Sequence, residues 1–222
     1  MTLEFFKDNG YVKIKEFVGS EVAKLLYDHM LFNEKRFLWL CDNRENYSFL
    51  KNWEPSVKSP YGYIRSGSAS CFSIYGDSVF EGLLYSYTKK IGEYIGLELI
   101  PTYSFSSVYR NGDELTPHTD RSSCEISVTF CLGYSNNEPW PIYLGKEISK
   151  SLSQYEAIPI FLYPGDIMIY KGIQTPHWRY PLDGDNHAQL FLHYNDKNGP
   201  YEEKHLFDQR PFVGLPSVSD AG

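Results

Sequence analysis

The sequence predicts a mainly β domain with flanking helices, and three observations support this fold class. The second half of the chain consists of short hydrophobic segments separated by turn residues, which is typical of antiparallel sheets. The first half contains two longer segments with hydrophobic residues at helical spacing. A length of 222 residues is enough for one such domain and hardly enough for two. We therefore expect a single domain over 1–222, with an N-terminal helical and lid segment (1–100), a β core (101–197) and a C-terminal arm (198–222).

Two helices are predicted in the first half. The first begins at Ser20, a residue type favoured at a helix N-cap, and the second extends from Asp77 to about Ile95, where Gly96 is positioned to end it. Their apolar residues are expected to pack on the outer face of one sheet. These residues are Val22, Leu25, Leu26 and Met30 in the first helix and Val79, Phe80, Leu83, Leu84, Tyr87, Ile91 and Tyr94 in the second. Residues 41–76 are rich in Tyr, Ser, Gly and Asn, and they fit either a substrate lid or an irregular surface connection.

Several strands are predicted in the second half. Residues 125–132 alternate between apolar and polar side chains, as in a half-buried strand. Residues 158–163 and 167–170 have the composition of two short strands joined by a turn. Residues 187–194 also alternate, and we expect one face of this strand to line the interior. That face consists of His187, Gln189, Phe191 and His193.

Two histidines and one aspartate have the pattern of a metal site. His118 and Asp120 lie two residues apart, so on an extended segment their side chains leave the same face and can converge on one ion. A His-x-Asp pair alone is weak evidence, because roughly 0.3 would occur by chance in such a chain. The turn at 111–114 before this pair and the short strands before His177 add support. Two imidazoles and one carboxylate on one side of an ion are typical of non-haem Fe(II) oxygenases, whereas three surface residues are the structural alternative.

These stretches resemble the 2-oxoglutarate and Fe(II)-dependent dioxygenase superfamily, and within it the prolyl 4-hydroxylase-like branch. The resemblance covers most of residues 101–196 well and residues 3–30 loosely. Its matching segments are Tyr109–Asp120, Ser127–Leu132, Tyr163–Tyr170 and Pro176–His177. It implies that the core is a double-stranded β-helix, a cupin-like jelly-roll of two facing sheets with the metal at its open mouth.

The resemblance also implies an activity. Fe(II) would be held by His118, Asp120 and His177, and 2-oxoglutarate and dioxygen would be consumed, with ascorbate as an accessory reductant. Oxidative decarboxylation of 2-oxoglutarate would be coupled to hydroxylation of a substrate C–H bond. The first hypothesis for the substrate is a peptidyl proline, and the second is a free amino acid or another small metabolite. A cupin-like metal-binding module without turnover is the third hypothesis.

One residue of the family pattern is missing. The family pairs the distal carboxylate of 2-oxoglutarate with an Arg or Lys on the strand after the second histidine. Ten residues after His177 the chain has His187, which would have to be protonated for this role, so that cosubstrate affinity would weaken as the pH rises. Arg179 and Arg110 are the competing cations. The resemblance implies Tyr103 and Tyr109 as hydroxyl donors to the same carboxylate, and Gln189 and His193 are further interior polar candidates.

Composition argues against several other classes. The formal net charge of −7 without a basic run disfavours duplex nucleic-acid binding. No apolar stretch is long enough for a membrane span or a secretory leader, so no membrane partner is expected. The four cysteines form no C-x-x-C pair, which favours a reduced, cytoplasmic chain. Residues 198–222 are expected to fold back over the barrel or the helices, with the last few residues frayed.

Overall fold

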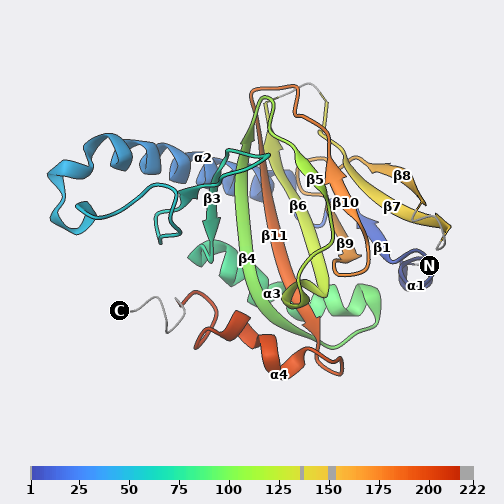
Figure 1. Ribbon diagram of the computed structural model, residues 1–222. Helices are drawn as coiled ribbons and strands as arrows, with labels where there is room; N and C mark the ends of the chain where they lie inside the picture. The colour runs from blue at the N-terminus through green and yellow to red at the C-terminus, as the bar shows by residue number, and fades with distance from the viewer. Residues whose placement is uncertain (1, 136–137, 150–153, 216–222) are drawn as a thin grey trace.

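The computed structural model describes residues 2–135, 138–149 and 154–215, and it consists of two facing antiparallel sheets with helices on one side (Figure 1). The larger sheet has seven strands in the order β1-β9-β6-β11-β4-β3-β2, and the smaller has four in the order β5-β10-β7-β8. The strands are β1 (Tyr11–Ile14), β2 (Tyr63–Ile64), β3 (Phe72–Tyr75), β4 (Leu99–Arg110), β5 (Leu115–His118), β6 (Ile126–Tyr134), β7 (Ile142–Ser149), β8 (Gln154–Ile160), β9 (Ile167–Lys171), β10 (His177–Arg179) and β11 (Asn186–Asp196). The helices are α1 (Thr2–Asn9), α2 (Ser20–Asn43), α3 (Ser78–Ile95) and α4 (Glu202–His205), with short 3-10 turns η1 (Arg44–Asn46), η2 (Ser48–Leu50), η3 (Ser122–Cys124) and η4 (Leu206–Gln209).

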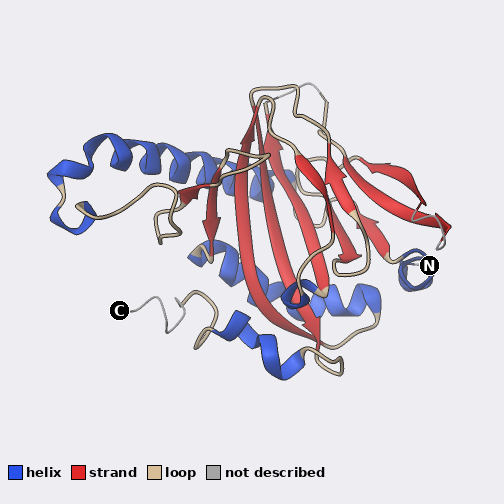
Figure 2. Ribbon diagram, in the orientation of Figure 1, coloured by secondary structure: helices blue, strands red, loops and turns tan. Residues whose placement is uncertain are grey.

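The large sheet separates the helical layer from the interior between the sheets (Figure 2). On β11, Leu190, Leu192 and Tyr194 belong to the hydrophobic core that the sheet forms with α2 and α3. Successive side chains of a strand point to opposite faces, so the other set on β11 faces the small sheet. The interior orientation predicted for His187 and the alternate residues that follow it is therefore correct.

Helix α3 forms and ends as predicted. The Asp77 side chain accepts hydrogen bonds from the backbone N–H groups of Val79 and Phe80 at 3.0 and 3.3 Å. Gly96 has a φ of 70°, a left-handed conformation that glycine adopts without strain. Phe80, Leu84 and Ile91 of this helix are buried in the core, whereas the predicted core residue Val79 is exposed.

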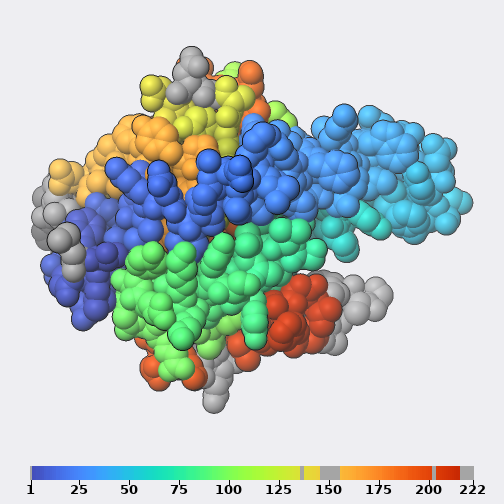
Figure 3. Space-filling view, turned by 180° about the vertical axis from the view of Figure 1, so that it is seen from behind, coloured from blue at the N-terminus to red at the C-terminus, as the bar shows by residue number. Residues whose placement is uncertain are grey.

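Helix α2 differs from its prediction in its start and in its buried face. Gly19 is the N-cap residue and makes no side-chain cap hydrogen bond, so Ser20 is not the cap. The side chains of Val22 and Leu25 are 43% and 67% exposed. Leu26 and Met30 are buried as predicted, and the buried face also includes Ala23 and Phe37. Seen from behind, α2 and α3 cover the large sheet, and the end of α2 projects from the body with the segment that follows it (Figure 3).

Part of the segment between the helices lies against the turn that precedes β5. The Ser68 carbonyl accepts a hydrogen bond from the backbone N–H of Glu114 at 3.1 Å, and the backbone N–H of Ser70 donates to the Asp113 carboxylate at 2.9 Å. Ala69 and Cys71 are buried in a small core with Tyr109, Leu115, Trp140 and Leu182. We call residues 65–71 the lid segment. Ala69 and Cys71 of this segment face the interior, whereas residues 66–68 and 70 are exposed.

The C-terminal arm folds back on the body, as predicted, through two sets of polar contacts. Arg210 donates to the buried Glu81 carboxylate and to the Thr102 carbonyl, both at 2.8 Å. Asp208 accepts two hydrogen bonds from Arg121, at 2.8 and 2.7 Å. The predicted fraying concerns residues 216–222, which lie outside the described residues.

Two further observations concern the described part of the chain. None of its helices is both long and apolar enough to cross a membrane. All four cysteines belong to it and carry free thiols.

Candidate metal centre

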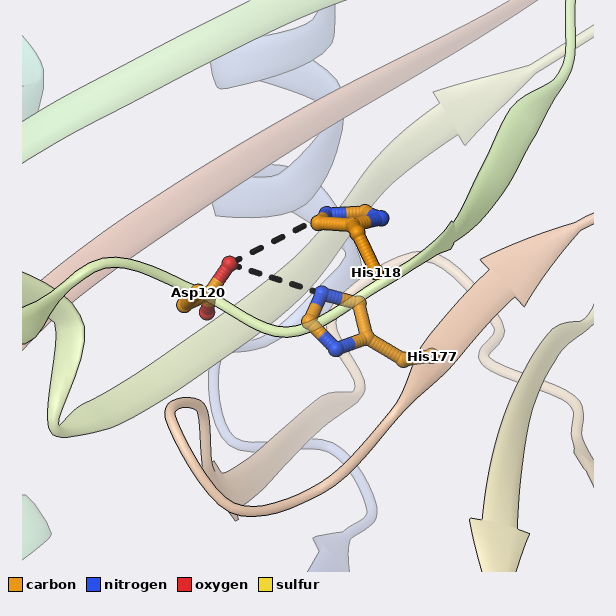
Figure 4. A group of neighbouring side chains, drawn as sticks. All are labelled: His118, Asp120 and His177. Carbon is orange, nitrogen blue, oxygen red and sulfur yellow. Dashed lines mark ion pairs between the residues drawn. The ribbon is translucent and has the colours of Figure 1, made fainter. Parts of the chain in front are cut away.

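The three predicted metal ligands converge at the mouth of the two sheets (Figure 4). His118 is the last residue of β5, His177 is the first residue of β10, and the two are paired across the small sheet. Asp120 follows His118 on the loop that leads toward the large sheet. One Asp120 carboxylate oxygen lies 3.5 Å from Nε2 of His177 and 3.9 Å from Nε2 of His118. All three ligand atoms lie within 4.8 Å of one another, so a single ion can contact them together.

The backbone orients both imidazoles for metal binding. Nδ1 of His118 donates to the Thr116 carbonyl at 2.8 Å, and Nδ1 of His177 donates to the Thr175 carbonyl at 2.9 Å. With the proton on Nδ1, the lone pair of each Nε2 is directed toward the centre of the site. Burial and the neighbouring His177 lower the pKa of His118, which favours the neutral imidazole that a metal requires. Such carbonyl partners are typical of ligating histidines.

Asp120 is held in its ionised form by neighbouring donors. Burial alone would raise its pKa, but the adjacent His177 and the hydrogen bond from Ser127 hold it below the ordinary value. The Ser127 hydroxyl lies 2.6 Å from Oδ2 of Asp120 and 3.0 Å from Nδ1 of His193. A Cβ on Gly172 would meet Oδ2 of Asp120 at 2.4 Å, so this close approach requires glycine. Asp120 thus presents Oδ1 to the two imidazoles.

A second group of metal-capable side chains, Cys124 and His193 with Asp120, overlaps this site. Burial and the nearby Asp120 charge raise the pKa of Cys124 to about 12, so its thiol is protonated at neutral pH. A cysteine binds metal as the thiolate. The ionisation states therefore favour the triad of His118, Asp120 and His177.

Arg179 is a buried cation in the same interior. It lies on β10 two residues after His177, on the same face, and is 1% exposed. Its guanidinium stacks 4.6 Å from the Trp140 ring, donates to the Trp140 carbonyl and donates to Oε1 of Gln189 at 3.2 Å. Its Nε has no partner, and no carboxylate of a described residue lies within 4.0 Å. Burial lowers the pKa of Arg179 to about 10, which leaves the group charged at neutral pH.

His187 lies at the position where the family pattern has a cation, but its surroundings in the ligand-free protein favour the neutral imidazole. It is fully buried on β11, and burial together with the Arg179 charge lowers its pKa to about 3. The alternative of a solvated loop residue is therefore wrong, and burial together with the Arg179 charge disfavours protonation of His187 in the ligand-free protein. Nε2 of His187 lies 2.8 Å from Oε1 of Gln189, and Nε2 of Gln189 donates to the Thr129 hydroxyl at 2.6 Å. Oε1 of Gln189 is consequently the acceptor for both His187 and Arg179.

The remaining candidates are divided between the two ends of the interior. Tyr109 packs edge-on to Trp140 at 5.1 Å, near Arg179. Tyr103 is six residues earlier on β4, roughly 20 Å away at about 3.3 Å per residue. Its hydroxyl lies 3.1 Å from Sγ of Cys124, and its ring packs 4.5 Å from His193. Tyr103 and Tyr109 therefore cannot both contact one carboxylate.

The competing cation Arg110 lies outside this interior, where it forms an ion pair with Glu34 on α2. Sequence reasoning also assigned no role to Ser127 and Thr129. The sequence feature that could have identified them is the alternation of β6, but in a half-buried strand the polar residues are expected to face solvent.

The comparisons with known proteins bear on the fold. No protein-family model matches the sequence, and no curated protein matches it significantly. A prolyl-4-hydroxylase from Pseudomonas putida is structurally similar, with a TM-score of 0.61 at 10% identity over 88% of this chain and 97% of that chain. The non-haem α-ketoglutarate-dependent epimerase SnoN from nogalamycin biosynthesis has a TM-score of 0.60 at 14% identity over 88% and 81% of the two chains.

A prolyl hydroxylase from Trichoplax adhaerens, in complex with a peptide of the oxygen degradation domain of hypoxia inducible factor, is also similar. Its TM-score is 0.58 at 13% identity, over 89% of this chain and 88% of that chain. Identities this low establish the fold rather than the reaction. The chain has the jelly-roll fold of the 2-oxoglutarate and Fe(II)-dependent oxygenases, which confirms the predicted fold class.

Proposed function

We propose that the protein is an Fe(II)- and 2-oxoglutarate-dependent dioxygenase that hydroxylates a C–H bond of its substrate. The observation that carries this proposal is the convergence of His118, Asp120 and His177 beside a buried arginine that has no acidic partner among the described residues. Two imidazoles and one carboxylate suit ferrous iron and leave the opposite coordination positions open. The similar structures support the same chemistry, since one structure of SnoN contains Fe3+ and α-ketoglutarate.

Six polar residues near the metal centre have a role in this proposal. His118, Asp120 and His177 would hold the iron, which supplies the activation of dioxygen when it is bound. Arg179 would bind the distal carboxylate of 2-oxoglutarate through its unpartnered Nε, because a buried guanidinium gains most from an anionic partner. Ser127 and His193 would hold Asp120 in place.

His187 has a positioning role in this arrangement. Since its Nε2 donates to Gln189, its unpartnered Nδ1 carries a lone pair and cannot donate to a carboxylate. His187 and Gln189 instead fix the plane of the Arg179 guanidinium. The loss of the usual Arg or Lys at position 187 is thus offset by an arginine at position 179.

Anaerobic titration of the Fe(II)-loaded protein with 2-oxoglutarate tests the proposal. We expect a weak visible charge-transfer band in the wild-type protein and none in His118→Ala. His29→Gln serves as the control, because His29 lies on α2, where it pairs with Asp77. If iron binds but no band forms at any 2-oxoglutarate concentration, the proposal fails and a metal-binding module without turnover is favoured.

The substrate belongs to one of two classes under this proposal. Similarity to two prolyl hydroxylases supports a peptidyl proline, whereas similarity to SnoN, which acts in nogalamycin biosynthesis, supports a small molecule. Succinate release in the presence of proline-containing peptides or of small molecules separates the two. We also propose a cytoplasmic location, which the four free thiols support.

A further inference from the structure

A second arginine, Arg65, lies beside the metal centre. It is the first residue of the lid segment, and its backbone N–H donates to the Cys71 carbonyl at 3.0 Å. Its guanidinium lies 5.7 Å from the centre of the Phe105 ring, which faces the interior from β4 and stacks on Phe191 at 6.1 Å. The side chain therefore extends over the inner face of the large sheet.

Arg65 lies on the same inner face as the metal centre. The ring of Phe191, on which Phe105 stacks, also stacks on His193 at 6.4 Å, and His193 shares the Ser127 hydroxyl with Asp120. The lid segment is hydrogen bonded to the turn that precedes β5, so its position relative to His118 is set by the fold. His118 is also the most exposed of the three metal ligands, with a side chain that is 43% exposed. Arg65 consequently borders the open side of the metal centre.

The surroundings of Arg65 do not neutralise its charge. No carboxylate belonging to residues that the structure describes lies within 4.0 Å of its guanidinium. Asp113, on the adjoining turn, accepts hydrogen bonds from the backbone of Ser70 and Arg110. Tyr109 and Cys71 are close to Arg65 but uncharged at neutral pH, because burial raises the pKa of Tyr109 to about 12 and also raises that of Cys71.

In the proposed complex, no negative charge balances the positive charge of Arg65. The two positive charges of Fe(II) and the single charge of Arg179 are balanced by Asp120 and the two carboxylates of 2-oxoglutarate. Arg65 then remains as an uncompensated positive charge in a partly buried, aromatic-lined space. An arginine in such a setting binds carboxylates well, because its fork of donors can make two parallel hydrogen bonds.

We propose that Arg65 binds a carboxylate of the primary substrate, and that this substrate is a small carboxylic acid of the free amino acid type. The proposal rests on the proposed dioxygenase function and selects the small-molecule class over an internal peptidyl proline, whose carbonyl group carries no charge. The guanidinium over Phe105 would hold the carboxylate at the rim, so that the rest of the molecule extends toward the metal.

The test uses Fe(II)-loaded protein saturated with 2-oxoglutarate without oxygen, so that the metal and Arg179 are already occupied. Two probes are added separately: a pool of the twenty free amino acids and the matched pool of amino acid amides. We expect the acid pool to raise the unfolding midpoint and to perturb the visible band. When oxygen is admitted, the acid pool should raise succinate release at least 10-fold. The amide pool should change neither the unfolding midpoint, nor the visible band, nor succinate release.

Three variants assign the effect to the side chain. Arg65→Gln should lose the response to the acid pool while its 2-oxoglutarate affinity stays within about 2-fold of wild type, and Arg65→Lys should retain part of the response. Arg36→Gln, which removes the same charge from an exposed position on α2, is the matched control and should behave as wild type.

The remaining outcomes overturn the inference in distinguishable ways. An equal response to amides, or a full response in Arg65→Gln, excludes carboxylate recognition by Arg65. A lost visible band in Arg65→Gln would place Arg65 in the cosubstrate site instead. If the wild-type band forms but neither pool has an effect, the dioxygenase function stands and the substrate class is wrong. If the wild-type protein forms no band, both proposals fail.

Discussion

At the scale of single residues, Arg179 is a buried cation without an anionic partner among the described residues. A cation removed from water is unfavourable unless it is paired, and Arg179 has only neutral acceptors within the described residues. An uncompensated buried charge therefore lowers the stability of the ligand-free protein. The same charge strengthens the binding of an anion that reaches it, because the interior screens the interaction less than water does.

Replacing Arg179 should separate stability from cosubstrate binding. We expect Arg179→Met to weaken 2-oxoglutarate binding roughly 100-fold, about 3 kcal/mol, as for a lost charge-assisted contact. The unfolding midpoint of the ligand-free variant should stay near that of wild type, since an uncompensated charge is removed together with two hydrogen bonds. Anaerobic thermal unfolding with and without 2-oxoglutarate measures both quantities.

His187→Gln is the matched control for that experiment, because it alters the neighbour of Arg179 without removing the cation. Its effect on 2-oxoglutarate affinity should be less than 10-fold. If His187→Gln loses more 2-oxoglutarate affinity than Arg179→Met, position 187 provides the carboxylate contact.

His187 should also make stability depend on pH. Its pKa is about 3 in the folded protein and near 6.5 when unfolded, so below pH 6.5 the unfolded state binds a proton that the folded state lacks. Stability is therefore unaffected by this group above pH 6.5 and is lost as the pH falls below it, by about 1.4 kcal/mol per unit. Urea unfolding at pH 7.5 and 5.0 should show a smaller difference for His187→Gln than for wild type, and equal differences would contradict this assignment.

At the scale of elements, sequence periodicity predicted which segments form strands. It predicted less well what the two faces of each strand contact. The alternation of β6 suggested a half-buried strand, but Ser127 and Thr129 are completely buried, because the polar face lines the interior of a jelly-roll. Periodicity reports a difference between two faces and cannot distinguish a polar interior from solvent. The buried face of α2 was predicted correctly for Leu26 and Met30 but not for Val22 and Leu25, since Ala23 marks one edge of that face and contributes little to a hydrophobic pattern.

The site shows the same division between local and tertiary information. The convergence of the candidate metal ligands was predictable because His118 and Asp120 are close in sequence and strand geometry brings their side chains to one face. The surroundings of Arg179 and His187, on which the proposed anchor rests, depend on tertiary structure. Gln189 of the large sheet accepts from Arg179 of the small sheet, and no local pattern encodes that approach.

The C-terminal arm is an element whose removal should be measurable. Glu81 and Arg210 each have side chains only 2% exposed, and Glu81 also accepts hydrogen bonds from the backbone of Ser104 and Gly214. A chain ending at residue 200 would leave Glu81 buried without its cation, which typically costs about 3–5 kcal/mol. We expect the unfolding midpoint to fall by roughly 10 °C, given about 2–4 °C per kcal/mol for a domain of this size.

Glu81→Gln provides the control for the truncation. It should destabilise the full chain, in which Arg210 needs its partner, and should recover part of the lost stability in the chain ending at residue 200. An unchanged midpoint after truncation would show that the arm contributes no stability to the fold.

At the scale of the whole molecule, the residues of the candidate metal centre come from both sheets. His118 and His177 belong to the small sheet, whereas Asp120 is hydrogen bonded to Ser127 of the large sheet. Strand β5 is the edge of the small sheet and pairs only with β10 among the described strands, with an irregularity in that pairing. A hydrophobic cluster that includes Leu144, Met168 and Tyr170 also joins the two sheets. Residues 116–118 of β5 are exposed, so β5 is expected to open more readily than the central strands.

Binding of metal and 2-oxoglutarate should therefore protect β5 and β10 together. We expect anaerobic Fe(II) to slow hydrogen exchange of the amides in these two strands, and 2-oxoglutarate to slow it further by joining the metal to Arg179 on β10. The central strands β6 and β11 should change little, because their amides are already paired on both sides. Asp120→Ala, which removes the ligand from the loop to the large sheet, should abolish the effect. Uniform protection of all strands, or protection that persists in this variant, would mean that the metal does not connect the sheets through Asp120.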